Sequence, residues 1–112
     1  MTNRSIKFRG AALSDLDGIT DYTLQTFGTL SLVRYIDDLE RVFTIISKHP
    51  EIGIAFVPKV RRFAIGQHWI YYSHSQKAVE IIRILPQKAV QKLRESPILY
   101  DLAHREWQGT SN

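Results

Sequence analysis

VRRFAIGQHWIYYSHSQKAVEIIRIL, residues 60–85, is the part of the sequence that determines the fold class. It contains three runs rich in Val, Ile, Phe, Tyr and Trp, which cover residues 60–65, 68–73 and 78–85. The connections between the runs are short and contain turn-forming glycine or serine, which is typical of β-hairpins. The stretch therefore predicts a three-stranded antiparallel meander.

Side-chain alternation in the middle run assigns its large residues to two faces of the predicted sheet. Trp69 and Tyr71 lie on one face, and Ile70 and Tyr72 lie on the other. If helices cover one face, the other stays partly exposed unless the C-terminal segment or a partner covers it. These aromatic residues are therefore interpreted either as core or as a partner-binding surface.

The sequence before this stretch predicts one strand and two helices. Alternation of apolar and basic residues predicts a short strand over residues 5–8. A first helix is expected to end at Gly28; residues 14–17 have the form of a capping box, although a start one turn earlier also fits. A second, amphipathic helix is expected over about residues 30–48, ended by Pro50.

The sequence after the meander predicts a helical C-terminal extension. Pro86 ends the last strand, and residues 87–107 predict two short amphipathic helices broken at Pro97. The fold class is therefore α+β: an N-terminal strand, a helical hairpin packed on one face of the sheet, the three-stranded antiparallel meander and the extension. A length of 112 residues predicts a single domain over residues 1–112, with its core at about 4–86.

The composition excludes several classes of protein. Hydrophobic residues make up 44% and charged residues 23%, which is typical of a globular chain. The absence of cysteine excludes a disulfide scaffold, a thiolate zinc site and a cysteine nucleophile. No run of about 18 apolar residues occurs, and the first residues lack the apolar core of a signal peptide. We therefore expect a cytoplasmic protein that does not bind membranes.

The positive charge is concentrated in the second half of the chain. Residues 1–50 hold six basic and six acidic residues, whereas residues 51–112 hold nine basic and five acidic residues. This distribution predicts a cationic face suited to nucleic acid or to an acidic protein partner. A solvated basic surface without a partner is the alternative interpretation.

Candidate catalytic residues suit metal-independent phosphodiester chemistry better than any other reaction. The four histidines form no i, i+4 pair and have no carboxylate cluster beside them, so neither a metal nor a cofactor is expected. Cleavage of RNA needs a cation on the phosphate, which Arg61 or Arg62 together with Arg83 could supply. His68 and Tyr100 could transfer protons. The alternative is that the arginines are solvated or paired and that His68 is satisfied by the backbone.

Several short motifs follow one another in a fixed order along the chain. They are Ala12-x-x-Asp15-Leu16-x-x-Ile19-x-x-Tyr22, Phe27-Gly28, His49-Pro50-Glu51-Ile52-Gly53, Arg61-Arg62-Phe63, Gly66-x-His68-x-Ile70-x-Tyr72 and Val79-x-Ile81-x-Arg83-Ile84-Leu85. At these spacings the series resembles the ParE branch of the RelE/ParE toxins over about residues 4–86.

The resemblance implies the toxin of a bacterial type II toxin–antitoxin system, neutralised by a small antitoxin. In the ParE branch it implies inhibition of DNA gyrase without catalysis by the toxin. In the RelE branch it implies ribosome-dependent mRNA cleavage, with Arg62 and Arg83 at phosphate-binding positions. The lysines and the C-terminal tyrosine of those nucleases have only loose counterparts in Lys59 and Tyr100, which favours the ParE branch. A weakly toxic homologue that binds its antitoxin is the third alternative.

One departure from the ParE pattern concerns the end of the chain. ParE-like chains commonly have a histidine where this chain has Pro86, and they end soon afterwards, whereas about 26 residues follow here. We expect an antitoxin tail to place acidic residues near the basic strands of the sheet. The residues predicted to bind a partner are Lys59, Arg61, Arg62, His68, Trp69, Arg83 and Tyr100.

Overall fold

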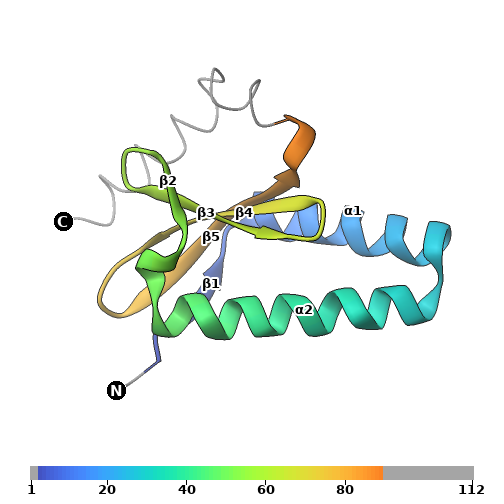
Figure 1. Ribbon diagram of the computed structural model, residues 1–112, viewed down its shortest axis with the longest axis horizontal. Helices are drawn as coiled ribbons and strands as arrows, with labels where there is room; N and C mark the ends of the chain where they lie inside the picture. The colour runs from blue at the N-terminus through green and yellow to red at the C-terminus, as the bar shows by residue number, and fades with distance from the viewer. Residues whose placement is uncertain (1–2, 90–112) are drawn as a thin grey trace.

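A five-stranded sheet with a helical hairpin on one face forms the described part of the chain (Figure 1). The structure is a computed structural model, and it describes residues 3–89. The elements, in chain order, are β1 (Ser5–Phe8), α1 (Gly10–Phe27), α2 (Thr29–Lys48), the 3-10 turn η1 (Pro50–Ile52), β2 (Ile54–Val57), β3 (Val60–Ile65), β4 (His68–His74), β5 (Ala78–Pro86) and the 3-10 turn η2 (Gln87–Ala89).

The strand order in the sheet is β1-β5-β4-β3-β2. Strands β3, β4 and β5 form the predicted antiparallel meander, with Phe63 opposite Ile70 and Ile70 opposite Ile84. Strand β1 is parallel to β5, and its Ser5 lies opposite Ala78. The α+β fold class, the N-terminal strand, the helical hairpin and the meander are therefore confirmed.

Strand β2 was not predicted from the sequence. It is only four residues long, it pairs with β3 at the edge of the sheet, and its ladder is irregular between Ala55 and Val57. Its residues, Ile-Ala-Phe-Val, show no apolar–polar alternation, and Ile54 is largely exposed. The usual period of two that identifies a strand is therefore missing from this segment.

The first helix begins one turn before the capping-box residues. Arg9 precedes it in an extended conformation, and its backbone N–H donates to the carbonyl oxygen of Ile81 on β5. This bond continues the β1–β5 ladder and sets where the helix starts, so Ser14 lies inside the helix. Gly28, with φ of +90°, separates α1 from α2, and a glycine adopts that conformation without the penalty a side chain would bring.

Two apolar clusters lie on opposite faces of the sheet. The cluster beneath the hairpin joins α1 and α2 to the sheet and consists of Ala12, Leu39, Val42, Ile46, Ile65, Ile70, Tyr72, Val79, Ile81 and Ile84. The second cluster consists of Val60, Tyr71 and Ile82, with Trp69 and Leu85 packed against it. The alternation predicted for Trp69 to Tyr72 is therefore confirmed. The predicted C-terminal helices lie outside the described residues.

Candidate functional site

The predicted basic residues of the meander do not form one surface. Arg61 lies opposite Tyr72, on the face covered by the hairpin, whereas Arg62 lies opposite Tyr71, on the other face. Arg83 also lies opposite Tyr71, across the neighbouring strand. Arg62, Tyr71 and Arg83 therefore pair in a row across three strands; a register shift lies next to this row in the β4–β5 ladder, and the Arg83 side chain extends from it to α1.

Arg62 is enclosed by aromatic rings in this row. The central carbon of its guanidinium group lies 4.1 Å from the centre of the Trp69 ring and 5.0 Å from that of Phe56. Such stacking stabilises a guanidinium through the negative face of the ring. Its Nε and Nη1 atoms are buried and have no hydrogen-bond partner among residues 3–89. Trp69 and Phe56 therefore hold Arg62 in place.

Arg83 is neutralised by a carboxylate from the first helix. Its Nε and Nη2 donate to the two carboxylate oxygens of Asp15, at 2.7 and 2.9 Å. The same carboxylate accepts the backbone N–H of Ile84 at 3.0 Å. Hydrogen bonding to Asp15 raises the pKa of Arg83 above its ordinary value. The carboxylate pairs with one edge of the planar guanidinium through two hydrogen bonds, so Arg83 is a structural link between α1 and β5.

Arg61 and Tyr72 hold the segment that follows α2. Arg61 Nη1 donates to the carbonyl oxygens of Gly53 and Glu51, at 2.7 and 3.2 Å. The Tyr72 hydroxyl donates to the carbonyl oxygen of Pro50 at 2.7 Å and accepts the N–H of Gly53 at 2.9 Å. The His49–Gly53 motif is thus fixed through backbone groups, because a buried peptide group needs a hydrogen-bond partner.

His68 faces the hairpin rather than Arg62. Its Nδ1 lies 3.4 Å from the Tyr35 hydroxyl of α2. Burial lowers the pKa of His68 below 6.5 and raises the pKa of Tyr35 to about 12. The pair borders a groove of about 1110 Å³ between the hairpin and the β3–β4 turn, which Tyr22, Phe27 and Pro86 also line.

Comparison with known proteins assigns the chain to a family. A sequence profile described as "ParE toxin of type II toxin-antitoxin system, parDE" matches residues 6–91. The chain belongs to this ParE family. Toxin ParE1 of Caulobacter vibrioides is 34% identical to it over 79 residues, which make up 68% of this chain and 81% of the relative. The resemblance to the ParE branch is thereby confirmed, and the chain is a ParE-type toxin component.

Solved structures of toxin–antitoxin systems contain chains with the same fold. A chain from the chromosomal ParDE system of P. aeruginosa superposes with a TM-score of 0.63 at 22% identity, covering 74% of this chain and 95% of that one. A chain from the E. coli DinJ-YafQ toxin-antitoxin complex superposes with a TM-score of 0.50 at 11% identity, covering 79% and 97%. At these identities the superpositions establish the shared fold.

The remaining predicted partner residues of this ParE chain lie apart from the arginine row or outside the described part. Lys59 occupies the β2–β3 turn with φ of +67°, and Tyr100 lies outside the described residues. Within residues 3–89, no group of three or more His, Asp or Glu side chains could hold a metal ion. The helices of that part are too short or too polar to cross a membrane.

Sequence reasoning missed the partners of the basic residues. Asp15 appeared in the sequence only as a member of a motif, and in the ParE structure its role is to bind Arg83. The only sequence signal for that role is that both residues occur in the ParE-like motifs. Arg4 and His74 were not singled out, and the structure brings both to a pocket lined also by Arg61.

Proposed function

We propose that this ParE-family chain acts as a non-enzymatic inhibitor of DNA gyrase and is neutralised by a cognate antitoxin. The observation that carries the non-enzymatic part is the Asp15–Arg83 ion pair. A phosphate-cleaving site needs cations that are free to bind the developing charge. The Nε and Nη2 edge of Arg83 is already bound to a carboxylate, which neutralises its charge, so Arg83 is unsuited to that role.

The RelE-type nuclease is the second candidate, and one observation favours it. Arg62 has two buried nitrogen atoms without a partner in the described part of the chain, and a phosphate would satisfy them. A phosphate-cleaving site also needs a second cation and a proton-transferring group, and within residues 3–89 the other arginine of the row, Arg83, is bound to Asp15. His68 does not supply that group, because it lies on the hairpin face.

A gyrase assay tests the proposal directly. Purified chain is added to gyrase and relaxed plasmid, and both supercoiling and accumulation of linear, cleaved DNA are measured. We expect supercoiling to fall and linear DNA to accumulate. Unchanged gyrase, with a correctly folded sample, contradicts the proposal.

A parallel ribosome assay separates the nuclease from a weakly toxic homologue. If mRNA is cleaved on the ribosome by the wild-type chain and not by Arg62→Gln, the nuclease is the correct assignment. Arg34→Gln is the matched control, because Arg34 is exposed on α2. If neither gyrase nor mRNA is affected, the chain is an antitoxin-binding homologue. Arg83 is unsuitable for such a test, because its removal leaves Asp15 without its partner.

The antitoxin part of the proposal predicts a salt-dependent complex. The basic residues Lys59, Arg61 and Arg62 would attract acidic residues of an antitoxin tail. Surface charge interactions weaken as salt increases, because the Debye length falls to about 3 Å at 1 M ionic strength. Loss of these charges should therefore weaken the complex and flatten its salt dependence. An affinity that responds neither to salt nor to the substitutions contradicts the electrostatic part.

A further inference from the structure

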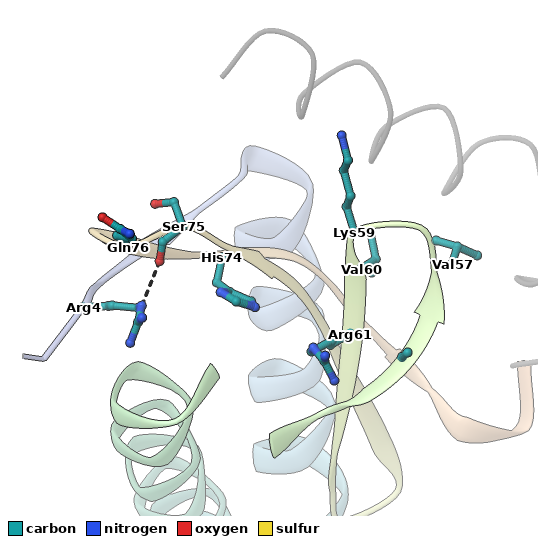
Figure 2. A pocket seen from close by; sticks show the side chains of 9 residues that line it. Arg4, Val57, Lys59, Val60, Arg61, His74, Ser75 and Gln76 are labelled. Atoms are coloured by element: carbon teal, nitrogen blue, oxygen red, sulfur yellow. Dashed lines mark hydrogen bonds between the residues drawn. The ribbon is translucent and has the colours of Figure 1, made fainter. Parts of the chain in front are cut away.

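A pocket of about 570 Å³ lies at the end of the sheet where the β2–β3 hairpin approaches the β4–β5 turn (Figure 2). Its basic lining comes from three distant parts of the chain: Arg4 before β1, Arg61 on β3 and His74 at the end of β4. Ala55 and Val57 of β2 form an apolar wall. No described residue that lines the pocket is acidic.

The two arginines are held in position by backbone carbonyl groups. Arg4 Nε donates to the carbonyl oxygen of Ser75 at 2.8 Å, as the dashed line in Figure 2 shows. Arg61 Nη1 donates to the carbonyl oxygen of Gly53 at 2.7 Å. The Nη2 group of each arginine makes no hydrogen bond to the described residues. Each guanidinium is therefore fixed at one side and retains donors for a ligand.

His74 lies between the two arginines in the view of Figure 2. Burial lowers its pKa, and the positive charges of Arg4 and Arg61 lower it further, while Glu51 raises it. Lys59, which also lines the pocket, extends from the β2–β3 turn above it (Figure 2). Four basic groups, Arg4, Lys59, Arg61 and His74, thus line one cavity, and Glu51 is the acid that acts on His74. This arrangement favours an anionic ligand.

We propose that this pocket binds the carboxylate of an acidic side chain from a protein partner. Arginine and carboxylate form paired, charge-assisted hydrogen bonds. The Ala55–Val57 wall suits the methylene stem of a glutamate, which a bare inorganic anion lacks. The inference deepens the proposed function and rests on its antitoxin pairing, because it names the group of the antitoxin that the toxin recognises.

Binding at this pocket is coupled to protonation of His74. A bound carboxylate stabilises the imidazolium form, so the pKa of His74 rises on binding. By linkage, affinity then increases as the pH falls from the raised pKa of His74 in the bound state to its lowered pKa in the free chain.

The experiment is an NMR titration of the full chain with a capped tetrapeptide that contains two glutamates. The matched probes are the same peptide with two glutamines and inorganic phosphate. We expect the glutamate peptide to shift the His74 and Ala55 resonances and to raise the pKa of His74. Equal shifts from the glutamine peptide, or tighter binding of phosphate, overturn the assignment to an acidic side chain.

Substitutions in and outside the pocket test whether the peptide binds there, and a second pocket variant is used if the first does not fold. Arg4→Gln should reduce the affinity about tenfold, as expected for loss of a charge-assisted hydrogen bond. Arg34→Gln, which removes an exposed arginine on α2, should change it by less than about twofold. If Arg4→Gln does not fold, His74→Gln replaces it and should abolish the pH dependence of binding. An equal loss in Arg34→Gln, or a pH dependence retained in His74→Gln, overturns the proposal.

The peptide titration contains neither gyrase nor antitoxin. Failure of the pocket proposal can therefore be distinguished from failure of the proposed function. A peptide that does not bind rejects this pocket while gyrase inhibition and antitoxin pairing can still be observed. Conversely, unaffected gyrase rejects the proposed target while the pocket still binds the glutamate peptide.

Discussion

Asp15 on α1 and Arg83 on β5 form a two-bond ion pair across 68 residues of sequence, with N–O distances of 2.7 and 2.9 Å. The side chains are only 14% and 26% exposed. The pair fastens the first helix beside the sheet beyond the end of β1, where Asp15 also accepts the N–H of Ile84. In this ParE-type chain, a residue expected to bind phosphate therefore supports the structure.

Replacement of Asp15 tests this structural role. Asp15→Asn leaves the partly buried Arg83 without its carboxylate, and we expect a loss of about 2 kcal/mol in the free energy of unfolding. Urea unfolding measures the change. Asp21→Asn is the control, because Asp21 is exposed on the same helix and its replacement should cost less than about 0.5 kcal/mol. Equal stability of the two variants would show that the ion pair contributes nothing.

The hydroxyl of Tyr72 provides a second test. Tyr72→Phe removes the partner of both Gly53 N–H and Pro50 C=O in a buried site. We expect a loss of about 2 kcal/mol, since each unsatisfied buried group costs about 1–3 kcal/mol. Tyr22→Phe, at a side chain that is 62% exposed, should be nearly neutral. Thermal unfolding followed by circular dichroism distinguishes the two, and a neutral Tyr72→Phe refutes the role of the hydroxyl.

Replacing glycine with alanine should have opposite effects on the stability of the chain at Gly53 and at Gly18. A Cβ atom at Gly53 would overlap the Tyr72 hydroxyl and lie 2.9 Å from the backbone oxygen of Arg62. Gly53→Ala should therefore destabilise the chain by about 2 kcal/mol or more. Gly18 lies within α1 with no atom within 4 Å of a new Cβ, so Gly18→Ala should stabilise by about 0.5–1 kcal/mol. Urea unfolding gives both signs, and a tolerated Gly53→Ala would contradict the tight packing.

The stability of the chain should fall as the solution becomes more acidic. Burial is the largest cause of the lowered pKa at both His68 and His74. The unfolded chain therefore binds protons near 6.5, and the folded chain binds them only at lower pH. The free energy of unfolding should decrease as the pH falls through that value and level off once both folded-state histidines are protonated.

Urea unfolding at a series of pH values between about 7.5 and about 5.5 spans the ordinary histidine range and measures this slope. The double variant His68→Gln, His74→Gln should have a flatter profile than the wild-type chain. A stability that rises on acidification, or a double variant with an unchanged slope, is incompatible with the burial of these histidines.

Local sequence patterns predicted most of the fold, but they predicted few of the contacts at the candidate sites. The period-two alternation of β4 correctly separated Trp69 from Ile70, and the turn residues defined the meander. Strand β2 escaped prediction because its pairing with β3, rather than a residue pattern, makes it a strand.

The contacts of the basic residues could not be predicted for a related reason. Arg83 meets Asp15, and Arg4 meets Ser75, across 68 and 71 residues, so no local spacing reports either contact. Arg61 and Arg62 are adjacent in sequence but lie on opposite faces of the sheet. A cluster of charges along a chain therefore indicates a basic half of the molecule without indicating which charges remain free.

The parallel pairing of β1 with β5 has a consequence for biosynthesis. Residues 5–8 leave the ribosome early, yet their ladder partners are residues 78–81. During translation the first strand therefore waits for about 70 further residues before its backbone groups find those partners, and contacts of such long range form late in folding. Completion of the sheet is thus tied to synthesis of β5, and a ribosome that stalls before β5 emerges carries a toxin domain in which β1 has no strand partner.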